Sequence, residues 1–147
     1  MNLIYSIWFM MGFSFIIQFI IMSIIMTNKY ENITFSIGKI YISVIMALLM
    51  GLTELIMYDI HMSSFSTSFY LSFIFSLTIF VYLYKNQVYI DDKEYLQEMI
   101  EHHSMALLTS EEILQKTQSV RVKKLAENII STQEKEINYM KQLIKLE

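Results

Sequence analysis

Long apolar runs separated by short polar breaks fill the first 87 residues. The runs cover residues 3–26, 40–58 and 65–84. About 20 apolar residues in a helix cross the hydrocarbon core of a bilayer, and each run is near that length. The pattern predicts a membrane domain at 1–87 with three transmembrane helices. It also predicts an integral, multi-pass membrane protein whose partner is membrane lipid.

Residues 88–147 have a different period, in which apolar side chains recur every three or four positions, as in amphipathic helices. Asp91 followed by Glu94 is typical of a helix start, and Ser119 is suited to cap a second helix. The pattern predicts an antiparallel helical hairpin and an all-α fold for the chain. The repeating positions are Leu96, Met99, Ile100, His103, Ala106, Leu107, Ser110, Ile113 and Leu114, then Val122, Leu125, Ala126, Ile129, Ile130, Gln133, Ile137, Met140 and Ile144.

A hairpin alone leaves much of both apolar stripes in water. Pairing with a second copy would complete a four-helix bundle. We therefore expect a homodimer formed through residues 88–147.

Composition narrows the chemistry. The 147-residue chain is 54% hydrophobic and has a formal net charge of −3, which gives no reason to expect a nucleic-acid partner. It has 12 Met and no Cys, so disulfides and thiolate metal sites are excluded. The sequence also lacks a Gly-x-Ser-x-Gly motif and a Gly-rich phosphate loop, and we expect no enzymatic activity.

The motif MIEHHSMA at residues 99–106 brings imidazole and thioether groups to one helix. Residues three and four apart are neighbours on a helix, so the Met side chains can lie near the two His rings. Counting from a turn near residues 117–118 places position 132 opposite His103 and position 136 opposite Met99. The candidate metal ligands are Met99, His102, His103, Glu136 and Met140, with Glu98, Met105 and Gln133 as supporting residues.

Imidazole and thioether ligands without thiolate suit Cu(I) or Ag(I). The carboxylates of Glu98, Glu101 and Glu136 would instead admit Zn(II) or Cu(II). A metal-free alternative is a hydrogen bond between His103 and Gln133 that satisfies two buried polar groups and fixes the register of the helices.

The second apolar run has a possible further metal face, because Met and acidic or imidazole groups follow one another at steps of three and four. Its members are Met46, Met50, Glu54, Met57 and His61. The alternative is an apolar face packed on another span. Lys29, Lys39 and Lys85 favour a cytoplasmic hairpin and an external N-terminus by the positive-inside rule.

The segments DDKEYLQEMIEHHSMALLTSEEI and VRVKKLAENIISTQEKEINYMKQLI resemble the domain of unknown function 305 (DUF305) family over about residues 91–144. The shared pattern is Met-Ile-x-His-His-x-x-Ala, followed by Leu-Ala-x-x-Ile-Ile-x-x-Gln-x-x-Glu-Ile-x-x-Met. The resemblance implies a ferritin-like bundle and, from some members, copper binding through His and Met. Two departures are Glu101, where many relatives have Pro, and a single hairpin, where many soluble relatives have two.

Together these observations predict a membrane-anchored copper- or silver-binding protein that sequesters the metal or confers tolerance to it, with Cu(I) as the bound ion. The competing hypothesis is a membrane-anchored oligomerisation module with a structural His/Gln pair.

Overall fold

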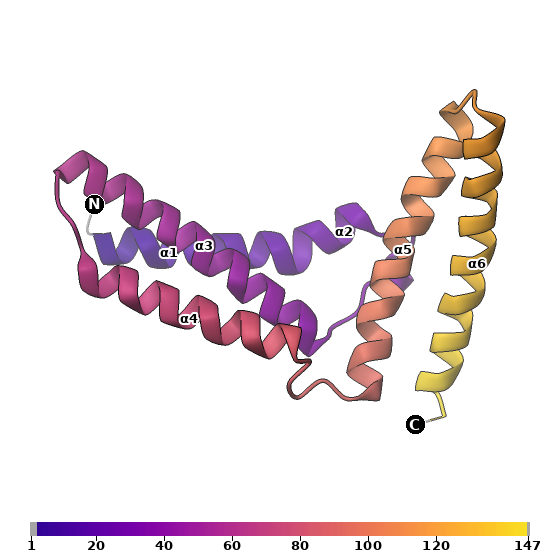
Figure 1. Cartoon of the computed structure of the whole chain (residues 1–147). Coiled ribbons are helices and arrows are strands. Elements are labelled where there is room, and N and C mark those ends of the chain that lie inside the picture. The colour runs from indigo at the N-terminus through magenta and orange to yellow at the C-terminus, as the bar shows by residue number, and fades with distance from the viewer. Residues whose placement is uncertain (1–2, 147) are drawn as a thin grey trace. The chain divides into compact units, whose positions relative to one another are not determined.

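Residues 3–146 are described by a computed structural model, and all regular elements in that range are helical, which confirms the all-α prediction (Figure 1). In chain order the elements are α1 (Leu3–Ile16), the π-helix η1 (Ile17–Ile21), α2 (Met22–Met26), the 3-10 helix η2 (Tyr30–Asn32), α3 (Ile37–Met62), α4 (Thr67–Lys85), α5 (Asp92–Lys116) and α6 (Val120–Ile144).

Three helical stretches are long and apolar enough to cross a membrane, as the sequence predicts. They are Leu3–Met26, Ile37–Met62 and Thr67–Lys85, with mean hydropathies of 2.2, 2.1 and 1.6. The second stretch is longer than the predicted 40–58 because the helix continues beyond the apolar run at both ends. Backbone contacts divide the described chain into two compact units. The first unit contains the residues up to 21 and residues 37–89, and most of it consists of these three stretches.

In the first unit, α3 packs against both α1 and α4, and it crosses α1 at an angle (Figure 1). Small residues on α3, Ala47 and Gly51, are buried four positions apart, and such spacing lets helices approach closely. A Cβ added at Gly51 would lie 2.7 Å from Cγ of Met11 and 2.9 Å from the ring of Phe73. A side chain at this position would therefore force Met11 or Phe73 to shift.

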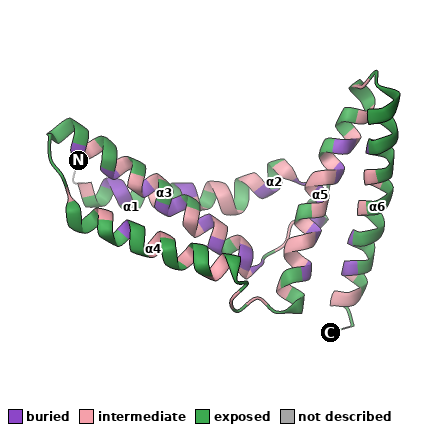
Figure 2. Cartoon of the chain, viewed as in Figure 1, coloured by how far each residue is buried: buried purple, intermediate pink, exposed green. Residues whose placement is uncertain are grey.

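The outer surfaces of the same helices are apolar and exposed, as Figure 2 shows for most of α4. On α1, Trp8 is 67% exposed and Phe9 is 68% exposed. Contiguous exposed apolar surface of this kind is unusual on water-soluble monomers and suits contact with lipid.

The second unit consists of residues 22–36 together with the chain from residue 90 on. Its main feature is the antiparallel pair α5 and α6 (Figure 1). Both predicted caps are present: the Asp91 side chain accepts a 2.8 Å hydrogen bond from the Glu94 amide, and Ser119 accepts one of 3.4 Å from Val122. The buried core contains Leu96, Ile100, Leu107, Ile137 and Met140.

The sequence did not predict that residues 22–36 belong with the hairpin. The second unit starts at Ile90, close to the expected domain boundary at 87/88, but it also includes this earlier segment. The segment covers a face of α5 that a two-helix hairpin would leave exposed. On α6, Val122 and Leu125 remain 40% and 59% exposed.

Candidate functional site

His103 lies in the seam between α5 and α6, where its side chain is 16% exposed. Its Nδ1 atom lies 3.1 Å from Oε2 of Glu136 on α6. The sequence spacing predicts position 132 of α6 opposite His103, one turn before Glu136. Helical side chains lean toward the N-terminus of their own helix, so in an antiparallel pair the tips of His103 and Glu136 approach each other although their backbones are offset.

The Nδ1 atom of His103 is buried without a well-aligned hydrogen bond, although the ring as a whole is only half-buried. Nδ1 has almost no contact with solvent and no partner of good hydrogen-bond geometry. The 3.1 Å approach of Glu136 is therefore close but poorly directed, and the described chain forms no hydrogen bond between His103 and Gln133. The polar partner of His103 is thus Glu136, in place of the expected amide.

The electrostatics of the seam favour a neutral imidazole. Burial lowers the pKa of His103, the carboxylate of Glu136 acts in the opposite direction, and His102 adds a smaller lowering. A neutral imidazole has a free lone pair on one ring nitrogen, which is the form that binds metal ions.

Two thioethers lie in the same seam. Met140 is a buried member of the core cluster, and Met99, four residues before His103, packs against that cluster. Spacing of four places Met99 and His103 on one helical face. The structure therefore brings Met99, His103, Glu136 and Met140 to the interface of α5 and α6.

His102 does not join this group. It is exposed, and its ring centroid lies 6.2 Å from that of His103 with the planes at 63°. Successive residues differ by about 100° around a helix, so two adjacent histidines cannot both face α6. The supporting residues Glu98, Met105 and Gln133 are all half-buried.

Oxygen and imidazole ligands alone do not make a metal site here. Among residues 3–146, no three His, Asp or Glu side chains lie together in a way that could hold a metal ion. A metal bound in the seam would therefore need the thioethers, which restricts the choice to soft ions.

The second candidate face, on α3, is divided between different environments. Met46, Met57 and His61 are exposed, whereas Met50 and Glu54 are half-buried. Glu54 accepts a short hydrogen bond from the hydroxyl of Ser6 on α1. A carboxyl group in an apolar span needs such a partner. The face therefore is not one continuous packed row within the described chain.

Residues 22–36 supply contacts to α5 that the sequence analysis did not predict. Ser23 and Thr34 bond to Glu101, and Asn28 and Asn32 bond to Ser104. The available signal was the run of Ser, Thr and Asn after the first apolar stretch, which resembles an ordinary polar loop.

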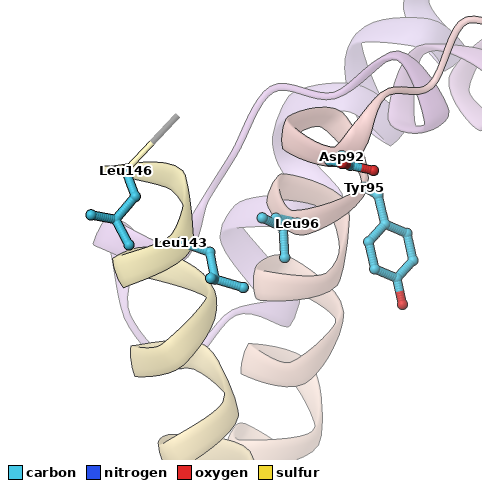
Figure 3. Close-up of a pocket in the computed structure, with 5 residues that line it drawn as sticks. All are labelled: Asp92, Tyr95, Leu96, Leu143 and Leu146. Atoms are coloured by element: carbon cyan, nitrogen blue, oxygen red, sulfur yellow. The ribbon is translucent and has the colours of Figure 1, made fainter.

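An open pocket of about 330 Å³ lies at the end of the hairpin away from its turn. Figure 3 shows Leu96 and Leu143 pointing toward each other between the helices, while Tyr95 points away from α6. None of the candidate ligands lines this pocket.

Residues 83–144 match the family model described as "Domain of unknown function (DUF305)". The chain is also 35% identical over 117 residues to "Uncharacterized protein L153" of Acanthamoeba polyphaga mimivirus, covering 80% of this chain and 76% of that protein. Residues 83–147 alone are too few for this alignment, so the similarity includes part of the apolar region. No solved structure matches the chain.

Proposed function

The chain belongs to the DUF305 family, and from this premise we propose that it is a membrane-anchored protein that binds a soft monovalent metal ion, Cu(I) or Ag(I), in the seam between α5 and α6. The observation that carries the proposal is the buried Nδ1 of His103, which has no aligned hydrogen bond and lies in a seam that also contains Met99 and Met140. A metal ion would use the imidazole lone pair that the surrounding protein leaves unused.

The groups present fit such an ion. His103 supplies neutral imidazole, the two Met residues supply thioether sulfur, and the chain has no thiolate to compete with them. The carboxylate of Glu136, whose Oε2 lies 3.1 Å from Nδ1 of His103, would offset the positive charge of an ion bound there. His102 is exposed next to this group and would receive the ion from solvent. The role that follows is sequestration or tolerance, without turnover.

We also propose three membrane passes, with the N-terminus outside and the hairpin in the cytoplasm. Length and hydropathy of the three apolar helices support the passes. Lys29 precedes the second helix, Lys39 lies in its first turn and Lys85 ends the third, whereas Asp59 lies near the other end of the second helix. The distribution of lysines supports the orientation.

The exposed stripe on α6 supports a homodimer. Val122 and Leu125 are exposed, and Ile129 continues the same face at a spacing of four. Glu136 follows Ile129 by seven residues, two turns later on that face. Pairing of two hairpins here would complete a four-helix bundle and would exclude water from the His103–Glu136 contact.

The test is an anaerobic titration of the full chain in detergent with Cu(I), in competition with a chromophoric chelator. His103→Ala and Met99→Leu variants should lose at least about tenfold in affinity. Met62→Leu is the matched control, since Met62 is exposed on the other unit and is not a candidate ligand, so this variant should leave the affinity unchanged. If His103→Ala competes as well as the unmodified chain, the seam does not hold the metal and the metal-free oligomerisation module becomes the better hypothesis.

A further inference from the structure

Both carboxylate oxygens of Glu101 accept hydrogen bonds from the 22–36 segment. The Ser23 hydroxyl donates to Oε1 at 2.6 Å, and the Thr34 amide donates to Oε2 at 3.0 Å. Ser23 lies in α2 and Thr34 lies eleven residues later, beyond η2. A single side chain of α5 therefore joins both ends of the segment.

Ser104 is the second point of attachment, and it is fully buried. Its hydroxyl donates to Oδ1 of Asn28 at 2.6 Å, and its oxygen accepts from the Asn28 amide at 3.1 Å and from Nδ2 of Asn32 at 3.3 Å. The Thr34 hydroxyl adds a 2.6 Å bond to the Gln97 carbonyl. Positions 97, 101 and 104 share one face of α5, because they are separated by four and three residues.

That face is adjacent to the one that meets α6. Each residue advances about 100° around a helix, so fixing Ser104 against the segment also fixes the direction of His103. Apolar contacts between α5 and α6 restrain the rotation of α5 about its own axis less strictly than directed hydrogen bonds do, because apolar contact has no preferred direction. A rotation of about 100° would instead turn His102 toward α6.

We infer that Glu101 and Ser104 are positioning residues, which use their hydrogen bonds to the 22–36 segment to hold α5 in the rotation that presents His103, and not His102, to Glu136. Neither residue would touch the metal. This inference rests on the proposed function, because His103, the histidine that faces Glu136 in this rotation, is the proposed metal ligand. It also links the candidate site to the segment that contains the end of the first membrane-length helix and the loop after it.

The rotation can be measured without metal, because the chain has no cysteine. Two double variants of the full chain in detergent, His103→Cys/Glu136→Cys and His102→Cys/Glu136→Cys, are oxidised with diamide, and the intramolecular disulfide is quantified by mass spectrometry. The 103/136 pair should form the disulfide much faster than the 102/136 pair.

Ser23→Ala and Asn28→Ala are then added to each pair of cysteines. These substitutions alter the 22–36 segment without any further change in α5. The ratio of 103/136 to 102/136 yield should fall by about fivefold or more, the effect of one typical hydrogen bond on an equilibrium. Lys29→Ala is the control, since Lys29 is an exposed residue of the same segment and should leave the ratio unchanged. An unchanged ratio in the Ser23→Ala/Asn28→Ala background would overturn the inference.

Helical content measured by circular dichroism identifies a variant that unfolds. In that case Ser23→Ala alone, which removes one hydrogen bond, is scored by the same ratio. Ag(I) titration separates the two proposals. If the unmodified chain does not bind Ag(I), the proposed function fails and the disulfide ratio still decides whether Glu101 and Ser104 set the rotation.

Discussion

The hydroxyl of Ser104, at the centre of α5, donates a 2.6 Å hydrogen bond to the side-chain oxygen of Asn28, 76 residues earlier in the chain. The serine is fully buried, and Asn32 beside it is 2% exposed. Buried polar groups of this kind are stable only as a set, because each depends on the others for its hydrogen bonds.

We predict that Ser104→Ala destabilises the second unit. The substitution removes the partner of Asn28 and Asn32 without creating space for water, and an unsatisfied buried polar group costs about 1–3 kcal/mol. Thermal unfolding of the full chain in detergent, followed by circular dichroism, should show a lower midpoint. Ser131→Ala, at an exposed position of α6, should leave the midpoint unchanged. Equal midpoints for the two variants would contradict the role of this hydrogen-bond set.

The pKa of His103 predicts a dependence of stability on pH. Burial lowers this pKa below the ordinary value of 6.5, so between the lowered pKa and 6.5 the unfolded chain binds more protons than the folded chain. Stability contributed by the neutral ring is therefore complete above pH 6.5 and is lost as the pH falls through that window. The thermal midpoint should decrease from pH 7.5 to pH 5.5 without metal.

Substitutions at the two adjacent histidines test whether His103, and not another titrating group, causes the pH dependence of stability. His103→Gln should reduce the difference between the midpoints at pH 7.5 and pH 5.5, because glutamine does not titrate. His102→Gln should retain it, since His102 is exposed. The reverse result would assign the pH dependence to the exposed ring.

The helical hairpin could be predicted from sequence because its signals are local. The side chains of Asp91 and Ser119 each accept a hydrogen bond from the backbone amide three residues later in the chain. The apolar stripes also repeat within each helix. The attachment of Ser23 to Glu101 has no such signal, because the partners are 78 residues apart and Ser23 is a single small polar residue within an apolar run. Only the folded chain reveals that its hydrogen bond goes to α5.

The candidate site was also predicted only in part, for a geometric reason. Spacing placed Met99 and His103 on one face, and the structure has both in the α5–α6 seam. Spacing also placed Met99 near His102, but a residue between two faces can turn either way until its neighbours are known. The contacts at Glu101 and Ser104, on the other side of the helix, leave His102 exposed.

The packing of α1 on α3 predicts that Gly51→Ala is more harmful than the same change at Gly12. A Cβ at Gly51 would lie within 3.0 Å of both Met11 and Phe73, whereas one at Gly12 would have nothing within 4 Å. Overpacking costs about 1–3 kcal/mol, while the gain in helix propensity, about 1 kcal/mol, is common to both sites. Thermal midpoints in detergent should fall for Gly51→Ala relative to Gly12→Ala. Equal midpoints would show that Met11 and Phe73 move aside at little cost.

The proposed homodimer predicts a specific sensitivity at Leu125. This side chain is 59% exposed on α6 and would be covered by the second copy. Leu125→Glu would place a charge inside the four-helix bundle, and the cost of desolvating an unpaired charge exceeds what one apolar contact contributes. Light scattering of the detergent-solubilised protein should therefore report a dimer for the unmodified chain and a monomer for Leu125→Glu.

Ser131→Glu is the matched control, because Ser131 is exposed on α6 and lies six residues from Leu125, which places it about 120° away around the helix. It adds the same charge and should leave the dimer intact. If both variants remain dimeric, the copies meet elsewhere on the chain. A monomeric unmodified chain would leave Leu125 in water and would remove the argument that a second copy shields His103 and Glu136.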